Sequence, residues 1–274
     1  MWRLLLPIAL WLTSCGPSAS APASETSSAS TDGPRIAALA PAIASTLQQL
    51  NLGDRIVARH AYDVTLDPSI PSAGDQSGLD YETLIRADPT HVLLDWGERD
   101  IPTRLRTLAD ERGWIIEILR MTTLDETRDA FAGLAARFGV NDSLTPALDE
   151  ALRARPERAR VGRVLLLMRA SPPEALGPGG HHHEILVALG ATPALTTGAS
   201  WQSLDAEDLR RIDPDAVILV SPNANDAPPA LPIEPAHVGV LNRPDAWLAG
   251  GPSIRFAEDL ARTLDAWAAA QPSD

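Results

Sequence analysis

Three consecutive histidines are the residues whose type and spacing best suit chemistry in this sequence: His181, His182 and His183. Neutral imidazole binds cobalt, iron and zinc, so the triplet is a candidate metal site. It follows a glycine-rich turn, and we predict a helix over residues 181–189. Because consecutive helical residues point about 100° apart, at most one or two of the imidazoles could face a common metal. The alternative is a solvated, polar helix start.

Aromatic and polar side chains in both halves of the chain form a second candidate site. Flat aromatic faces supply apolar area and stacking geometry for a large planar ligand. Each tryptophan could instead pack between a loop and the body of the protein. Besides the three histidines, the candidate ligand-binding residues are Tyr62, Gln76 and Trp96 in the first half and Arg169, Trp201 and Trp247 in the second.

An internal repeat indicates how the chain positions these residues. LDYETLIRADPTHVLL at 79–94 and LDAEDLRRIDPDAVIL at 204–219 match at nine of sixteen positions without a gap. In each copy Asp80 or Asp205 is a predicted helix N-cap, an Asp-Pro pair ends the helix, and an apolar, strand-like run follows. The repeat predicts an α/β fold of two similar lobes, with a connecting helix and a ligand cleft between them.

The predicted strands and domain boundaries follow from the same patterns. Ligands in open α/β folds bind beyond the carboxyl ends of the strands, and the candidate residues lie in loops that follow predicted strands. We expect an N-terminal lobe at 35–142, a connecting helix within 143–159 that ends near 154, and a C-terminal lobe at 160–274. Strands are predicted at 35–39, 55–59, 91–94, 114–119, 163–168, 216–221 and 237–242, with loops at 60–78, 169–180 and 222–235.

The N-terminus has the pattern of a targeting segment. Arg3 is followed by the apolar residues 4–12, and Leu-Thr-Ser-Cys-Gly at 12–16 is similar to a bacterial lipobox. Cleavage of a signal peptide, residues 1–14, would leave lipid on Cys15, the only cysteine; the alternative is an incidental thiol. Residues 15–34, rich in Ser, Ala, Pro and Thr, predict a flexible tether. The expected location is the periplasmic or extracytoplasmic face of a bacterial membrane.

Composition and motifs exclude several classes of function. A net charge of −13 without a basic patch argues against nucleic-acid binding. The sequence lacks the G-x-S-x-G, H-E-x-x-H and G-x-x-x-x-G-K-[ST] motifs, so we expect no catalytic activity and no intrinsic cofactor. We expect a monomer.

The order of these segments resembles the metal-chelate-type substrate-binding proteins of ABC importers, which include periplasmic cobalamin, haem and ferric-siderophore binders. The resemblance covers residues 35–267. It implies two α/β lobes bridged by a rigid helix, with a ligand between them. The segments that carry it are RIAALAPAIASTLQQLNLGDRIVARHAYD and LDYETLIRADPTHVLLDWG in the first half, and RVLLLM, GPGGHHHEILVALGA, WQSLDAEDLRRIDPDAVILVSP and AWLAGGPSIRFAEDLARTL in the second.

The resemblance also implies roles for individual residues. In this family a glutamate on each lobe docks onto arginines of the ABC importer permease, and the matching positions are Glu82 and Glu207. Both could instead be first-turn carboxylates favoured by the helix dipole. Cobalamin is the first expected cargo, haem the second and a ferric siderophore the third. Tyr62, with a histidine from the triplet, could ligate a haem iron.

Two departures from the family pattern leave other functions open. Pro156 interrupts the expected connecting helix, and the segment 222–235 is short and rich in proline. One alternative is a zinc- or manganese-binding transport protein, although the sequence has a single histidine cluster where such a site needs three or four converging ligands. The other is a lipid-anchored interaction protein without a transport role.

Overall fold

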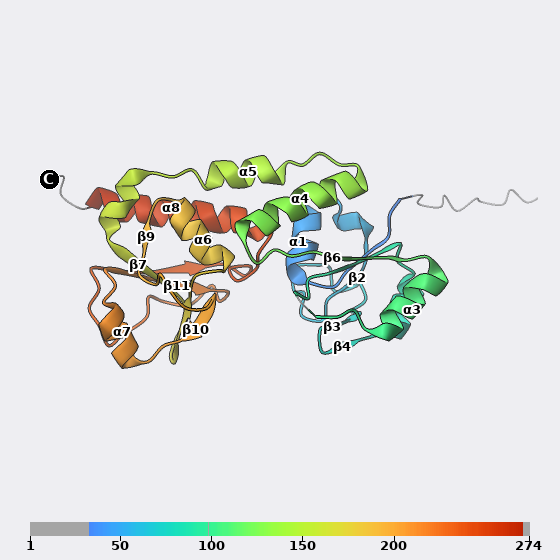
Figure 1. The fold of residues 1–274 in the computed structure, drawn as a ribbon, viewed down its shortest axis with the longest axis horizontal. Helices are drawn as coiled ribbons and strands as arrows, with labels where there is room; N and C mark the ends of the chain where they lie inside the picture. Colours follow the sequence, from blue (N-terminus) through green and yellow to red (C-terminus); the bar gives the residue numbers. More distant parts are fainter. Residues whose placement is uncertain (1–32, 98, 271–274) are drawn as a thin grey trace, which may run out of the picture. The chain divides into compact units, whose positions relative to one another are not determined.

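The computed structural model describes residues 33–97 and 99–270, which form two α/β lobes (Figure 1). Cys15, the predicted signal peptide and nearly all of the predicted tether lie outside these residues. No helix in the described ranges is long and apolar enough to cross a membrane.

The first lobe is built on a parallel sheet of strand order β2-β1-β5-β6. The central strands are apolar nearly throughout, which is the pattern of parallel strands with both faces covered. All four strands lie where the sequence predicts them: β1 (Ile36–Ala38), β2 (Ile56–Arg59), β5 (His91–Leu94) and β6 (Ile115–Ile118). The helices that alternate with them are α1 (Pro41–Gln49), α2 (Tyr81–Ala87), α3 (Thr103–Arg112) and α4 (Leu124–Phe138).

The second lobe has a mixed sheet of order β10-β8-β7-β11-β12, with β9 paired to the start of β7. The sequence predicts β7 (Arg163–Ala170), β11 (Ala216–Ser221) and β12 (His237–Asn242), which are parallel. The predicted loop at 169–180 is wrong in part, because Pro173–Leu176 turns back along β7 as antiparallel β8. The sequence also misses β9 (Thr192–Pro193) and the edge strand β10 (Trp201–Ser203).

The remaining elements connect or cover the sheets. The predicted loop at 60–78 contains part of a small ladder, β3 (Gly74–Asp75) against β4 (Gly78–Leu79), which the sequence does not predict. Two short 3₁₀ turns are η1 (Gly53–Arg55) and η2 (Pro156–Val161). The helices of this group are α5 (Leu144–Ala151), α6 (His181–Ala188), α7 (Ala206–Ile212) and α8 (Pro252–Ala270).

The two copies of the repeat form equivalent units, α2 followed by β5 and α7 followed by β11. Asp80 accepts a hydrogen bond from a first-turn backbone N–H at 3.0 Å, and Asp205 accepts two at 2.8 Å. Both predicted N-caps are therefore confirmed. Each helix ends on a left-handed aspartate, Asp88 (φ 41°) or Asp213 (φ 45°), directly before the proline.

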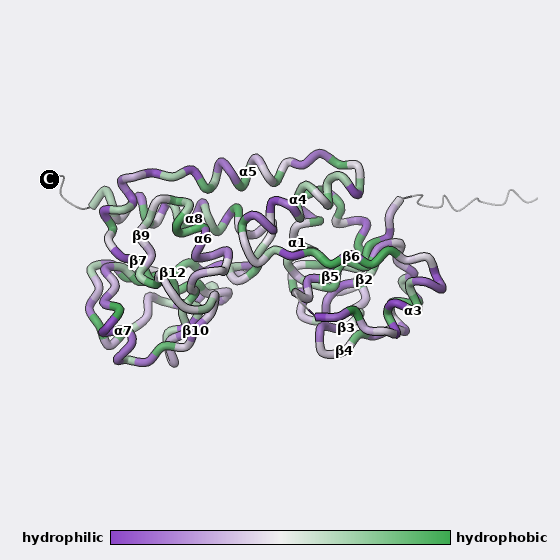
Figure 2. The backbone as a smooth tube through the Cα atoms, in the orientation of Figure 1, coloured by the Kyte–Doolittle hydropathy of each residue, from purple (hydrophilic) through white to green (hydrophobic). Residues whose placement is uncertain are grey.

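Hydrophobic packing continues from one lobe into the other. Side chains alternate across a strand, so Ile36 and Ala38 of β1 join the cluster that contains Val164 and Leu166 of β7, whereas Ala37 faces a cluster of first-lobe residues. Figure 2 shows the hydrophobic stretches along the strands of both lobes. The shared cluster includes residues of α1, α4, α6 and α8.

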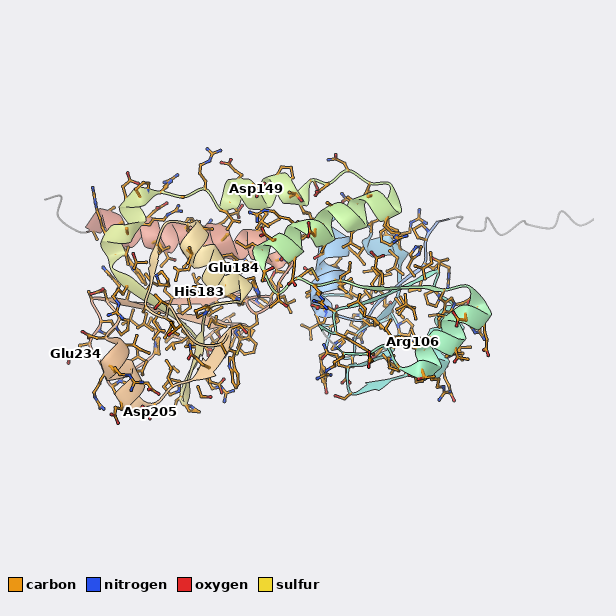
Figure 3. The ribbon with its side chains drawn as sticks, viewed as in Figure 1. Arg106, Asp149, His183, Glu184, Asp205 and Glu234 are labelled. Atoms are coloured by element: carbon orange, nitrogen blue, oxygen red, sulfur yellow. The ribbon has the colours of Figure 1, made fainter. Side chains whose placement is uncertain are left out.

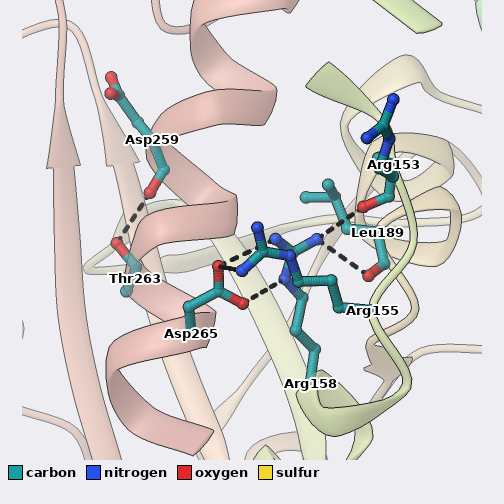
Figure 4. Close-up of polar contacts among 7 residues, drawn as sticks. All are labelled: Arg153, Arg155, Arg158, Leu189, Asp259, Thr263 and Asp265. Carbon is teal, nitrogen blue, oxygen red and sulfur yellow. Dashed lines mark hydrogen bonds and ion pairs between the residues drawn. The ribbon is translucent and has the colours of Figure 1, made fainter. Parts of the chain in front are cut away.

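The connector between the lobes is shorter than predicted. Helix α5 ends at Ala151, and Arg155 is extended (φ −130°, ψ 116°), because the residue before a proline is disfavoured in the α region. Arg158 in η2 then fastens the connector to α8 through Asp265, at 2.7 and 3.1 Å (Figure 4). This hydrogen-bonded ion pair lowers the pKa of the Asp265 carboxyl below its ordinary value.

Candidate functional site

A pocket of about 430 Å³ lies at the carboxyl ends of β7 and β11, where the strand-end rule for open α/β folds places a ligand. Two of the predicted ligand-binding residues, Arg169 and Trp247, line it. The sequence did not single out its other lining residues, which lie near the ends of the two strands or in the loop after β11: Met168, Ala170, Leu219, Ser221, Pro222, Asn223, Asp226, Ala227 and Pro229.

Hydrogen bonds hold the loop that forms one wall of this pocket. Asp226 accepts from the Ser221 hydroxyl at 2.5 Å and from the Asn223 side-chain amide at 2.7 Å. Asn242, at the end of β12, donates to the Asp226 backbone carbonyl at 2.7 Å. The proline-rich loop is therefore tied to the ends of two parallel strands.

Trp247 and Arg169 present different chemistry to the pocket. The Trp247 indole N–H donates to the Val220 carbonyl at 2.8 Å, which fixes the ring while 43% of the residue stays exposed. The Arg169 side chain is 57% exposed and forms an ion pair at 2.8 Å with Glu174 of β8, whose side chain is 9% exposed. This buried carboxylate holds the Arg169 guanidinium in place. The remaining N–H groups of the guanidinium are available to an anionic group of a ligand.

In the first lobe, the segment after β2 exposes apolar side chains. Tyr62 is 73% exposed, and Val64 is exposed as well. The Tyr62 backbone N–H donates to Nδ1 of His60 at 3.2 Å. Burial lowers the pKa of His60, although the nearby Asp75 and Asp63 oppose this shift. The imidazole therefore supports this segment as a buried neutral acceptor while the Tyr62 ring faces solvent.

The other first-lobe candidates lie near the end of β5. Gln76 donates from its side chain to the Asp95 carbonyl at 3.1 Å. Trp96 is buried within the first-lobe hydrophobic cluster, so its ring packs in the core in this structure. Asp95, which the sequence analysis missed, has a pKa raised by burial and by the charge of Glu126. Its position directly after a predicted strand is the signal that could have identified it.

The three histidines of α6 point toward different partners and do not line the pocket. His182 is buried, contacts the Ala246 carbonyl through Nε2 at 2.8 Å, and has a pKa lowered to about 4 by burial. His183 contacts the Leu195 carbonyl through Nε2 at 2.9 Å. His181 packs on the His182 ring, and burial lowers its pKa well below the ordinary value. Across the described ranges, no group of three or more His, Cys, Asp or Glu side chains is arranged to hold a metal ion.

The remaining candidates lie on other surfaces. Trp201 is half-exposed on the edge strand β10, outside the pocket lining. Glu82 and Glu207 are exposed at the second position of α2 and α7. Figure 3 labels Asp205, the N-cap of α7 in the second lobe. Neither glutamate side chain has a hydrogen bond or ion pair with another described residue.

Comparisons with known proteins agree on the architecture. A family model described as "Periplasmic binding protein" matches residues 36–230. A search of curated proteins found no match. Among solved structures, the chain is similar to the periplasmic haem-binding protein BhuT, with 21% identity, a TM-score of 0.66 and coverage of 86% of this chain and 99% of that one.

Other solved structures have the same fold and were named for different ligands. The periplasmic vitamin B12 binding protein BtuF of Vibrio cholerae is 17% identical, with a TM-score of 0.63 and coverage of 86% and 98% of the two chains. A possible iron-binding periplasmic protein from Staphylococcus epidermidis is 16% identical, with a TM-score of 0.64 and coverage of 83% and 97%. At these identities the similarity shows the fold.

Proposed function

The chain belongs to the periplasmic binding protein family, a family of non-enzymatic proteins, and from this premise we propose that it captures a metal chelate outside the cytoplasm and delivers it to an ABC importer permease. The observation that carries this proposal is the pocket at the ends of β7 and β11, whose lining includes Trp247 and Arg169. In it an anchored indole lies close to a guanidinium, which suits a ligand with both a broad apolar face and an anionic group.

The first lobe supports the same class of ligand. Tyr62 and Val64 are exposed in the segment that follows β2, and ligands of open α/β folds bind beyond the carboxyl ends of strands. We propose that the chelate lies between the lobes, with its flat face against Tyr62 and Trp247. In a haem complex, the phenolate of Tyr62 would be the side chain placed to bind the iron.

Cobalamin remains the first cargo to test, haem the second and ferric siderophores the third. Arg169 is the one arginine among the pocket-lining residues, and its charge is paired with Glu174. A single, already paired cation fits a ligand with few negative charges better than a strongly anionic siderophore. Gln76, Trp96, Trp201 and His181–His183 are proposed as ligand contacts with less support, because they are buried, hydrogen bonded or outside the pocket lining.

We further propose that Glu82 and Glu207 dock onto permease arginines and that lipid on Cys15 anchors the chain. Equal placement in two repeats, exposure and the lack of a described partner support docking. Glu82→Ala and Glu207→Ala should keep chelate binding and lose uptake into cells, while Glu258→Ala, an exposed carboxylate of α8, should keep both. For the anchor, Cys15→Ser should release the chain from membranes, and unchanged membrane retention would contradict it.

Visible-absorbance titrations of the protein into aquocobalamin, cyanocobalamin and haemin test the cargo. Saturable binding of one chelate at one equivalent supports the proposal. A band shift with aquocobalamin and none with cyanocobalamin would mean that a protein side chain replaces the cobalt-bound water. If no chelate, ferric siderophores included, binds or raises the melting temperature, the proposal is wrong. Stabilisation by Zn²⁺ or Mn²⁺ would then favour the metal-transport alternative, and no stabilisation would favour the interaction protein.

A further inference from the structure

The histidine triplet is followed by Glu184, whose carboxylate reaches from the second lobe to the first. Glu184 Oε2 accepts a hydrogen bond at 2.6 Å from the backbone N–H of Leu124, the first residue of α4. Figure 3 shows Glu184 on α6 beside the start of α4. The first N–H groups of a helix have no partner within the helix, and the helix dipole places partial positive charge there. A carboxylate is therefore well matched to this position.

Helix α4 already has its own cap, so Glu184 is not needed to begin the helix. Thr123 accepts from the Glu126 backbone N–H at 3.2 Å, and the Glu126 carboxylate accepts from the N–H groups of Thr122 and Thr123 at 3.0 and 3.1 Å. This capping box does not include the N–H of Leu124, which donates to Glu184 of the other lobe. The contact thus joins the two lobes, in addition to satisfying one N–H group at the start of α4.

The two histidines before Glu184 hold α6 in the second lobe. Nε2 of His182 contacts the Ala246 carbonyl and Nε2 of His183 contacts the Leu195 carbonyl. Three consecutive residues therefore reach three different segments, because each points about 100° from the last. The histidines fix the helix from which the Glu184 carboxylate extends.

A second junction is buried and has no charge. The Thr46 hydroxyl of α1 accepts from the Gly251 N–H at 3.0 Å, just before α8, and donates to the Ala42 carbonyl at 2.7 Å. Gly250 has a φ of 75°, and a Cβ there would lie 2.5 Å from the Thr46 hydroxyl and 2.8 Å from the Met121 sulfur. A larger residue cannot fit without moving α8 away from α1. This close approach is a tight, uncharged contact that could act as a pivot.

We propose that Glu184 is a positioning residue that sets the arrangement of the two lobes before ligand binds. The buried Gly250–Gly251 contact with Thr46 acts as the pivot, and the Glu184 bond to α4 acts as a latch, a charged contact that can break while the pivot holds. The proposal rests on the proposed function, in which both lobes contact one ligand. A latched chain binds more tightly, because more molecules have the binding-competent arrangement.

Pulsed electron–electron double resonance measures the distance between two spin labels and tests the latch on the full-length chain without ligand. Cys15→Ser removes the only cysteine, and Asp110→Cys on α3 with Arg210→Cys on α7 supplies two exposed label sites, one in each lobe. Glu184→Ala should broaden the distance distribution, and Glu184→Gln, which keeps an acceptor oxygen, should broaden it less. Gly250→Ala should shift the mean distance, because it displaces the pivot.

Asp149→Ala is the matched control. Asp149 of α5 also contacts α4, through the exposed side chain of Arg128 at 2.9 Å and not through the helix start, so its loss should leave the distribution unchanged. Circular dichroism checks that each variant is folded. An unchanged distribution in Glu184→Ala, or equal broadening in Asp149→Ala, overturns the latch. Because these distances need no ligand, they separate failure of the latch from failure of the proposed function.

Where a chelate binds, Glu184→Ala should weaken its affinity about tenfold, with Glu184→Gln in between. Broadened distances with unchanged affinity for a chelate that binds would overturn the role in binding.

Discussion

The two lobes expose their strand ends in different ways. The second lobe has a pocket whose wall is tied down by Asp226 and whose arginine is held by Glu174. The first lobe presents Tyr62 and Val64 on a segment that projects them into solvent. Under the proposed function, we infer a division of roles, in which the second lobe would provide the seat for the ligand and the first lobe an apolar cover.

The largest expected effect comes from breaking the ion pair that joins the connector to α8. The Arg158 side chain is 4% exposed and paired with Asp265, so Arg158→Ala leaves a carboxylate without its main partner. Arg158 also donates to the backbone carbonyls of Arg153 and Leu189, so we expect a total loss of about 3 kcal/mol in the free energy of unfolding, measured in urea. Arg155 pairs with the same carboxylate at 3.2 Å but is 61% exposed. Arg155→Ala should cost less than about 1 kcal/mol, and equal losses would contradict this distinction.

The second prediction compares a buried histidine of each lobe by its effect on the pH dependence of stability. The pKa of His182 is lowered to about 4, whereas the unfolded chain has the ordinary value of 6.5. Between these values the unfolded state binds more protons, so stability falls as pH drops from about 6.5 to about 4, by about 3 kcal/mol from this residue. In urea titrations across this range, His182→Gln should lose that part of the pH dependence. His60→Gln should change it less, because Asp75 and Asp63 oppose the lowering of that pKa.

The sequence predicts the features that depend on residues close together in the chain and misses those that depend on distant residues. N-caps such as Asp80 and Asp205 are predicted correctly because their partners lie two or three residues away. Strand β8 was missed because Pro172 precedes it, Pro173 begins it, and Glu174 follows, whose burial makes sense only beside Arg169. That pairing depends on the turn back along β7, which no local pattern specifies.

The candidate site shows the same limit. The strand-end rule led to Arg169, near the end of β7, and to Trp247, after β12, and both line the pocket. The spacing of His181–His183 fixed only how their rings diverge, and the carbonyls that His182 and His183 contact lie 64 and 12 residues away. Sequence alone could not separate a metal site from a helix anchor there. The roles of these residues toward a ligand stay predictions.

The aromatic side chains test the seat-and-cover comparison directly. Trp247→Ala and Tyr62→Ala should each weaken binding of the chelate about tenfold, or about 1.4 kcal/mol, because each removes apolar contact area. Trp247→Phe should lose less, since an aromatic face remains even without the hydrogen bond to Val220. Trp201→Ala is the comparison variant and should weaken binding less, because Trp201 is similarly exposed but lies outside the pocket lining. A larger loss of affinity in Trp201→Ala than in Trp247→Ala would mean that the ligand binds at β10 and not in this pocket.

The smallest effect concerns the repeat, where the lobes are most alike. Asp80→Ala and Asp205→Ala should each cost about 1 kcal/mol in the free energy of unfolding, because each leaves first-turn N–H groups without an acceptor. The caps differ in detail: Asp205 accepts from two backbone N–H groups, whereas Asp80 accepts from one and from the Thr83 hydroxyl at 2.6 Å. Asp205→Asn and Asp80→Asn keep an acceptor and should recover most of the stability. Matching losses in urea titrations would show that the lobes share the same helix-start energetics, so that their difference lies in the strand-end loops; a loss at one site alone would place the asymmetry in the repeat itself.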